Sequence, residues 1–258
     1  MIGFCPLASG SKGNCIYVGT ATTKILIDAG ISAKMIRERL GAIGVQLEDI
    51  DAVLITHEHT DHIKALNMLG CKMGIPVFAN SDTAKAIYAI MDACPQFKIF
   101  STGETFEFGC IEVHPFSIQH DAVDPVAFTM RVGAIKLGFC ADLGFVTTLV
   151  VNQLKGCDYL YVEANHEPSM VHSCARPMVY KQRVLGRQGH LSNEECARLI
   201  ELVYHEGLKH VHLAHLSSEC NAPELALKIV SEKLKSLQAK TEVSIAFQER
   251  LSREILFI

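Results

Sequence analysis

The sequence AVLITHEHTDHI, residues 52–63, joins an apolar run to a dense group of histidines. The apolar part, within residues 51–56, is typical of a buried strand in an α/β sheet. Three imidazoles and a carboxylate that could bind a metal follow within six positions, from His57 to His62. Imidazole and carboxylate together are the ligand set of zinc, manganese and iron. The stretch therefore predicts a metal site at the end of a strand.

The spacing within this motif places its side chains in one volume. His57 and His59 are two positions apart, so on an extended chain both side chains point to the same side. Asp61 and His62 lie where a helix is expected to begin and can point back toward the two imidazoles. One such cluster does not complete two metal sites, so we expect further ligands at the ends of later strands.

Three later residues meet that expectation. His120, Asp142 and His215 each follow an apolar run that reads as a strand, and a rigid sheet can aim side chains placed there. His114 is a rival of His120, but it lies inside a strand and precedes a proline. We favour His120 because of the motif HDAVDPVAF that begins with it.

The chain of 258 residues is half apolar and one-fifth charged, an ordinary globular composition. Short apolar runs punctuated by Gly, Ser and Asn predict strands in the first half. The second half is more helical, with helices expected near residues 146–155, 176–186, 192–206 and 222–238. Two groups of strands, each followed by helices, predict two mixed sheets with helices outside. We therefore expect a single α/β (α+β) domain over residues 1–258, with four-layer αββα architecture.

Composition also excludes several classes of protein. No apolar run approaches 18 residues, which argues against a membrane span, and the N-terminus lacks the pattern of a secretion signal. The net charge is −4, so a nucleic-acid partner would be held by a local basic patch or by metal. Ten cysteines without a C-x-x-C pair favour free thiols in a reducing cytoplasm.

The order of these motifs resembles a known family. HxHxDH followed by His, Asp and His resembles the metallo-β-lactamase superfamily, and the stretch around Asp28 (IDAG) resembles its first acidic motif. LASGSKGNC, THEHTDHI, QHDAVDPVAF, CADLG, EANHE, GHLSNEE and LAHLS look like one branch, the WalJ/YycJ-type exonucleases. The combination covers residues 7–217 and is much more specific than HxHxDH alone.

The resemblance implies a dinuclear site of two divalent ions, zinc or manganese. One ion would be held by His57, His59 and His120, the second by Asp61, His62 and His215, and Asp142 would bridge them. It also implies a metal-dependent phosphodiester hydrolase, a DNA exonuclease of 5′-to-3′ polarity that uses a metal-bound hydroxide as nucleophile. Asp61 or Asp142 could steer the proton of that nucleophile.

Two other functions stay open at this stage. The first is hydrolysis of a thioester or lactone on the same fold. The second is a non-catalytic role as a metal-binding regulator or nucleic-acid adaptor. The sequence does not decide the oligomeric state.

His190 is a further catalytic candidate. In GHLSNE, residues 189–194, helix capping accounts for the Ser, Asn and Glu but leaves the glycine and His190 unexplained. Related phosphodiesterases of the superfamily place a histidine here, beside the scissile phosphate. The resemblance therefore implies that His190 stabilises the transition state or protonates the leaving oxygen.

Substrate contacts are expected in two places. The loop SGSKGN between two strands could hold an anion on exposed amides, although it could equally be a plain hairpin loop. Residues 174–191 carry basic residues and no acid, and three arginines would share one face of a helix, unless this is only a solvated surface. The expected substrate-binding residues are Ser9, Ser11, Asn14, Arg176, Arg183, Arg187 and Asn193.

Overall fold

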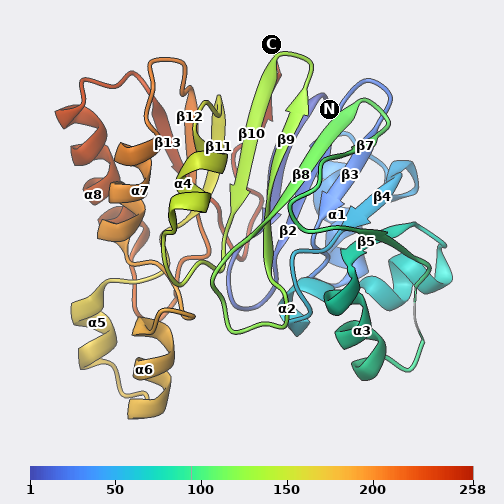
Figure 1. Cartoon of the computed structure of the whole chain (residues 1–258), viewed down its shortest axis with the longest axis horizontal. Helices are drawn as coiled ribbons and strands as arrows, with labels where there is room; N and C mark the ends of the chain where they lie inside the picture. Colours follow the sequence, from blue (N-terminus) through green and yellow to red (C-terminus); the bar gives the residue numbers. More distant parts are fainter. Residues whose placement is uncertain (94, 258) are drawn as a thin grey trace. The chain divides into compact units, whose positions relative to one another are not determined.

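The computed structural model describes residues 1–93 and 95–257. The chain forms two seven-stranded mixed sheets with helices (Figure 1). By compactness it divides into two units. The first unit comprises Met1–Pro115, Ala122–Val126 and Phe247–Ile258, and the second comprises Phe116–Asp121 and Ala127–Ala246.

The first sheet has the order β14-β1-β2-β3-β4-β5-β6. Its strands are β1 (Gly3–Ala8), β2 (Cys15–Gly19), β3 (Lys24–Ile27), β4 (Ala52–Leu54), β5 (Val77–Asn80), β6 (Phe97–Phe100) and β14 (Ile255–Leu256). β1, β2 and β3 are antiparallel neighbours, whereas β3 to β6 run parallel. β4 is buried along its whole length, as its apolar sequence requires. Because β3 and β4 are parallel, the residues after both strands lie at the same edge of this sheet.

The helical segments of the first unit are short. They are α1 (Ala33–Ala42), a 3₁₀ turn (Leu47–Asp49), α2 (Thr60–Ile63), a π-helix (Asn67–Lys72) and α3 (Ser81–Ile90). The side chains of Ser32 and Asn80 cap α1 and α3 by accepting a backbone N–H. The helix expected from Asp61 is a single turn that is followed by the π-helix.

The second sheet has the order β13-β12-β11-β10-β9-β8-β7. Its strands are β7 (Phe106–Phe108), β8 (Ile111–Ser117), β9 (Val126–Val132), β10 (Ile135–Cys140), β11 (Tyr159–Glu163), β12 (His210–Ala214) and β13 (Glu242–Ile245). β10, β11, β12 and β13 run parallel, so the segments after β10, β11 and β12 leave the sheet at one edge.

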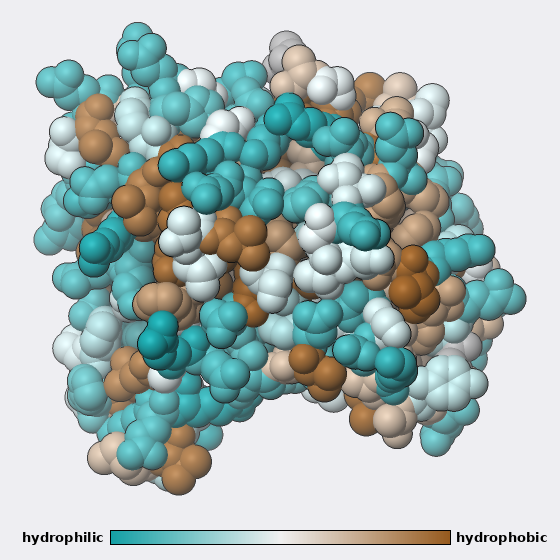
Figure 2. Space-filling view, viewed as in Figure 1, coloured by the Kyte–Doolittle hydropathy of each residue, from teal (hydrophilic) through white to brown (hydrophobic). Residues whose placement is uncertain are grey.

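The second unit contains α4 (Thr148–Leu154), α5 (Pro168–Ser173), α6 (Met178–Leu185), α7 (Asn193–Val203) and α8 (Pro223–Ser236). α7 packs on α8, and α5 and α6 pack on each other beyond the ends of β11, β12 and β13 (Figure 1). Met178 and Val179 of α6 expose most of their side chains, and Figure 2 shows brown, hydrophobic surface at the foot of this helical pair.

The predicted strands and most predicted helices are confirmed to within a few residues, but α5 was not predicted from the sequence. Among the described residues, no helix combines the length and apolar character needed to cross a bilayer.

Candidate metal centre

The loop after β4 carries the first group of candidate ligands, and Asp28 organises it. Asp28 adopts a left-handed backbone conformation (φ 59°) directly after β3. Its buried carboxylate accepts hydrogen bonds from the Thr56 backbone N–H (2.9 Å) and hydroxyl (2.9 Å), and from His62 Nδ1 (2.8 Å). Asp28 therefore ties the start of the histidine loop to its end.

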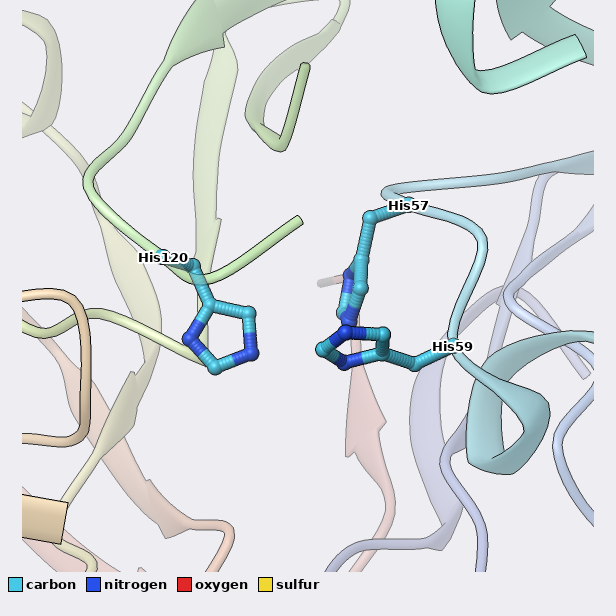
Figure 3. A group of neighbouring side chains, drawn as sticks. All are labelled: His57, His59 and His120. Atoms are coloured by element: carbon cyan, nitrogen blue, oxygen red, sulfur yellow. The ribbon is translucent and has the colours of Figure 1, made fainter. Parts of the chain in front are cut away.

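These contacts set the tautomers of two histidines. The Thr56 hydroxyl donates to Asp28 and so accepts from His57 Nδ1, 2.9 Å away. His57 and His62 consequently both carry hydrogen on Nδ1 and keep a lone pair on Nε2, the form in which imidazole binds a metal. The His57 ring centroid lies 4.0 Å from that of His62 and 4.5 Å from that of His59. Figure 3 shows His57 and His59 extending from the same loop.

Asp61 and Asn14 complete this first group. Asp61 Oδ2 lies 3.7 Å from His62 Nε2, and the Asp61 side chain is 26% exposed. Asn14 Nδ2 lies 3.0 Å from His62 Nε2 and 3.4 Å from Asp61 Oδ2, while Asn14 Oδ1 accepts the Gly10 N–H. Asn14 thus links the loop SGSKGN to the histidine motif.

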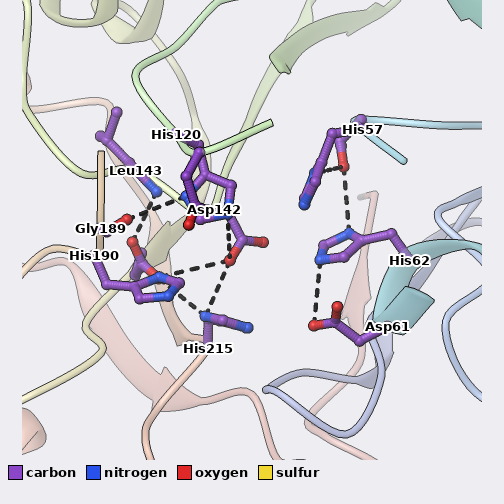
Figure 4. A network of polar contacts seen from close by, with 12 residues as sticks. His57, Asp61, His62, His120, Asp142, Leu143, Gly189, His190 and His215 are labelled. Atoms are coloured by element: carbon purple, nitrogen blue, oxygen red, sulfur yellow. Dashed lines mark hydrogen bonds and ion pairs between the residues drawn. The ribbon is translucent and has the colours of Figure 1, made fainter. Parts of the chain in front are cut away.

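The second group of candidate ligands lies at strand ends in the second unit. Asp142 and His215 follow β10 and β12, and both adopt left-handed conformations (φ 54°). Asp142 Oδ1 lies 3.3 Å from His215 Nδ1, 3.6 Å from His190 Nδ1 and 3.9 Å from His120 Nε2. Figure 4 shows these side chains converging on Asp142.

Glu163, the last residue of β11, holds this second group in place. Its fully buried carboxylate accepts from His190 Nδ1 (2.8 Å) and His215 Nδ1 (3.0 Å) through Oε1. Oε2 accepts the backbone N–H groups of Leu143 (2.8 Å) and Leu191 (3.1 Å). Burial alone would raise the pKa of Glu163, but the two histidines and these bonds hold it at about 2.

The donor set of the second group fits a metal ion. Ligand atoms of Asp142, Glu163, His190 and His215 lie within 4.8 Å of one another. Because Glu163 contacts Nδ1 of His190 and His215, Nε2 is the nitrogen through which each ring would bind a metal. His120 donates from Nδ1 to the Gly189 carbonyl (3.2 Å), and burial lowers its pKa, so it too is neutral with Nε2 available.

The structure brings the expected ligands together within each unit. His57, His59, Asp61 and His62 lie together in the first, and His120, Asp142 and His215 lie together in the second. His190, expected from the sequence as a catalytic residue and not as a ligand, also lies in the second group, with Nδ1 3.6 Å from Asp142 Oδ1. Glu163 was seen from sequence only as a strand-end residue of open role, and its hydrogen bonds to two histidines become visible only in the fold.

The rival histidines lie elsewhere. His114 Nδ1 contacts the Thr105 hydroxyl on the surface between strands. His210 and His212 pack on each other inside β12, with ring centroids 4.7 Å apart. His166 is buried beside the start of α7, where its backbone pairs with Ser192.

Several residues that were expected to contact substrate are buried in the fold. Asn193 is fully buried, and its amide exchanges two hydrogen bonds of 2.9 Å with Asn221. Ser9 is 1% exposed and Asn14 is 3% exposed. Of the loop residues expected to meet substrate, only Ser11 is exposed.

The prediction that Arg176, Arg183 and Arg187 share one helix face within residues 174–191 is wrong. The helix begins at Met178 and ends at Leu185, so Arg183 is helical whereas Arg176 precedes the helix and Arg187 follows it. Pro177 explains why Arg176 lies outside the helix, because proline lacks the N–H needed inside a helix and favours its start. At the other end, Gly186 is the C-cap, so Arg187 lies beyond the helix.

Two of these arginines are also engaged by acids. Arg176 forms a two-point ion pair with Glu219, at 2.8 and 2.5 Å. Arg183 Nε lies 2.5 Å from Asp121 Oδ2. Arg187 instead stacks over the ring of Phe145, 4.3 Å from its centroid.

Comparison with known proteins identifies a family for this chain, with ligands at the ends of its strands. The model of the beta-lactamase superfamily domain matches residues 23–213. Exodeoxyribonuclease YycJ of Bacillus anthracis is 38% identical over 90% of this chain and 88% of its own length. The chain belongs to the metallo-β-lactamase superfamily. Within it, the match to YycJ places the chain in the WalJ/YycJ family, which confirms the resemblance seen in the sequence.

Two further similarities agree with this family. Exodeoxyribonuclease WalJ of Streptococcus pneumoniae is 36% identical over 94% of this chain and 91% of its own length. The metallo-β-lactamase fold protein YhfI from Bacillus subtilis aligns with a TM-score of 0.72, at 15% identity over 98% of each chain, which supports the fold alone. The family and the candidate metal ligands make this WalJ/YycJ-family chain a metal-dependent nuclease.

Proposed function

We propose that this chain is an exodeoxyribonuclease that degrades DNA from the 5′ end. The observation that carries the proposal is the pair of ligand groups, each held by a buried carboxylate, in a chain similar over nine-tenths of its length to exodeoxyribonuclease YycJ. The polarity follows the family resemblance of the sequence. We place the activity in the cytoplasm, because nine of the described cysteines are free thiols.

In this proposal the two units form one catalytic domain that holds two divalent ions, zinc or manganese. His57, His59 and His120 would hold the first ion and Asp61, His62 and His215 the second, with Asp142 between them. Imidazole and carboxylate donors with Nε2 available suit both metals. When bound, the ions would lower the pKa of a water molecule and neutralise charge on the phosphate.

His190 supplies acid catalysis in this proposal. The Glu163 carboxylate is charged at neutral pH and accepts from His190 Nδ1 at 2.8 Å. This contact fixes the orientation of the His190 ring and occupies Nδ1, so Nε2 is the ring atom that would carry a proton to the leaving oxygen. The backbone N–H groups on the other Glu163 oxygen keep that carboxylate from rotating.

Two polar groups remain as candidate DNA contacts. Ser11 is exposed in the hairpin loop, and Arg187 lies two residues before Gly189, whose carbonyl accepts from His120. Arg176 and Arg183 would contact phosphate only by leaving Glu219 and Asp121. We therefore expect Arg187 to matter most among the three arginines.

The test compares substrates under one set of conditions. Purified protein with Mn²⁺ or Zn²⁺ is incubated with 5′-labelled DNA, 3′-labelled DNA, RNA and a thioester. We expect early release of mononucleotide from 5′-labelled DNA. Cleavage of the thioester alone would favour an acyl hydrolase, and binding of DNA without turnover would favour an adaptor.

The metal assignment has its own variant. Asp61→Ala removes a carboxylate that is 26% exposed, so we expect the fold to persist while elemental analysis finds one ion fewer per chain. Asp82→Ala, which removes an exposed acid of α3, is the matched control and should keep both ions. Full metal content and full activity in Asp61→Ala would show that the assignment is wrong.

A further inference from the structure

A groove of about 570 Å³ opens beside Asp61 in the first unit. Its walls come from three segments: the hairpin loop with Ser11 and Lys12, residues 60–67, and the end of α3 from Ile90 to Asp92. Asp61 is a proposed metal ligand, so a strand whose phosphate lies at the metal centre would have this groove as its neighbour. Apart from Asp61 and Ser11, the residues that line the groove have no role in the proposed function.

The backbone around the groove is held in place by hydrogen bonds between the segments that line it. Gly30 N–H donates to Asn14 O (2.8 Å), and Asn14 N–H donates to Asp61 O (2.8 Å). A Cβ added at Gly30 would lie 1.6 Å from Asp61 O, so these segments touch backbone to backbone. Gln248 fixes the outer loop, because Oε1 accepts the Lys12 N–H (2.7 Å) and Nε2 donates to Gly13 O (2.9 Å). Binding here requires little ordering of the chain.

The lining combines two lysines, two carboxylates (Asp61 and Asp92) and apolar surface. Lys12 and Lys64 both line the groove. Lys12 Nζ lies 2.8 Å from Glu249 Oε1, but both side chains are about 70% exposed. Because an ion pair this exposed to solvent contributes little free energy, Lys12 can exchange Glu249 for a phosphate at low cost. Ile90 is 59% exposed, and with Met91 it offers an apolar wall. Phosphate beside a sugar and a flat base is the chemistry that matches both features.

We propose that this groove binds the nucleotide next to the scissile bond of a DNA strand. Lys12 and Lys64 contact its phosphate, and Ile90 and Met91 contact its sugar and base. The inference rests on the proposed exonuclease function. It assigns substrate affinity to the first unit, apart from the acid catalysis assigned to His190.

Binding without turnover tests the groove directly. The K12A/K64A variant is titrated with a 5′-phosphorylated, fluorescent oligo-dT in EDTA, and anisotropy is measured at several salt concentrations. Each phosphate contact on a single strand contributes about 0.7 to the slope of log K against log salt, so we expect the slope to fall by about 1.4. K34A/K98A removes two exposed lysines of the same unit that do not line the groove, and should leave the slope unchanged.

Kinetics separate the groove from the metal centre. We expect K12A/K64A to raise the KM for DNA roughly tenfold, while metal content and hydrolysis of bis(p-nitrophenyl) phosphate stay at wild-type values. Ile90→Asp, which places an anion on the exposed apolar wall, should raise the same KM. Equal salt slopes for K12A/K64A and K34A/K98A overturn the groove assignment even if the wild type degrades DNA. A wild type that degrades no DNA overturns the proposed function, whereas the anisotropy slopes still decide whether the groove binds phosphate.

Discussion

The two groups of candidate ligands are built in different ways. In the first unit, His57, His59, Asp61 and His62 lie within six consecutive residues, in the loop after β4 and the start of α2. Asp28, the residue after β3, holds both ends of this segment through its hydrogen bonds to Thr56 and His62. In the second unit, the ligands follow separate strands, and the buried carboxylate of Glu163 contacts two of the histidines at once. The first group is therefore a property of local chain geometry, and the second depends on how parallel strands are registered.

The difference predicts which property is lost when the carboxylate that orients each ligand group is removed. Asp28 orients one proposed ligand directly, His62, and reaches His57 through the Thr56 hydroxyl. Glu163 orients a proposed ligand, His215, together with the proposed acid, His190. Damage to Glu163 should therefore affect metal binding and proton transfer together, whereas damage to Asp28 should affect metal binding alone.

Removal of His190 gives the largest expected effect. His190→Ala should lower turnover of DNA by roughly 10²–10⁴, the usual contribution of a positioned acid or base, with metal content unchanged. A nitrophenyl phosphodiester needs little protonation of its leaving group and should lose less. His114→Ala, which removes an imidazole outside both ligand groups, is the control. If His190→Ala degrades DNA at the wild-type rate, His190 has no catalytic role and residues 189–194 serve only to begin α7.

The two carboxylates can be compared directly. Glu163→Gln and Asp28→Asn should each weaken metal binding about 10- to 100-fold, as the loss of a residue that orients a ligand usually does. Only Glu163→Gln should also change the pH profile of turnover, because it removes the charge beside His190. Metal titration and pH–rate curves on both variants check this. Identical pH profiles for the two variants would contradict the distinction.

The pKa of Glu163 makes a separate prediction for the metal-free protein. It lies at about 2 in the fold, below the ordinary value of 4.5. A lowered pKa stabilises the fold above the unfolded value, so stability should be lost progressively as the pH falls from about 4.5 toward 2. Urea unfolding across this range should show less pH dependence for Glu163→Gln than for the wild type. Equal pH dependence would show that Glu163 is not held ionised in the fold.

A smaller effect concerns the start of α7, next to His190. Ser192 and Glu195 form a reciprocal capping box, in which each side chain bonds the other's backbone N–H. Ser192→Ala should cost about 1 kcal/mol of unfolding free energy, measured by urea denaturation, with little change in metal affinity. A large loss of activity at unchanged stability would mean that Ser192 acts on substrate.

The smallest expected effect concerns cysteine reactivity, which also differs between the units. Cys110 is exposed, and hydrogen bonds from Thr20 and Thr22 lower the pKa of its thiol. Burial raises the pKa of Cys157 in the second unit to about 12. Iodoacetamide at pH 7.5 should therefore modify Cys110 first, and Thr20→Val should slow that reaction a few-fold. Peptide mass mapping over time measures the rate at which each thiol is modified. Modification of Cys157 before Cys110 would contradict this prediction.

The sequence predicted best what depends on neighbours along the chain. The histidine motif after β4 is contiguous, and its strand and spacing can be read without a fold. Asn193 was expected to meet substrate because it sits in the motif of His190, but its partner Asn221 lies 28 positions away and buries it. Likewise, the charge of Arg183 is visible in the sequence, while its pairing with Asp121 depends on how α6 packs. Hydrogen-bond and ion-pair partners that are brought together by tertiary packing show no periodic pattern in the sequence, so they could not be predicted from it.

Three left-handed residues, Asp28, Asp142 and His215, lie one or two positions after strands. Asp142 and His215 belong to the second ligand group, and Asp28 orients the first. An L-residue in this conformation costs roughly 1 kcal/mol or more, which glycine does not incur. Glycine at Asp142 would relieve this cost and remove a proposed metal ligand in the same step, whereas glycine at Asp28 or His215 would also remove buried hydrogen bonds to His62 or Glu163. A thermostability screen on this chain would therefore need a selection for metal binding or turnover in every round, because a substitution at Asp142 can raise stability while it removes a proposed ligand.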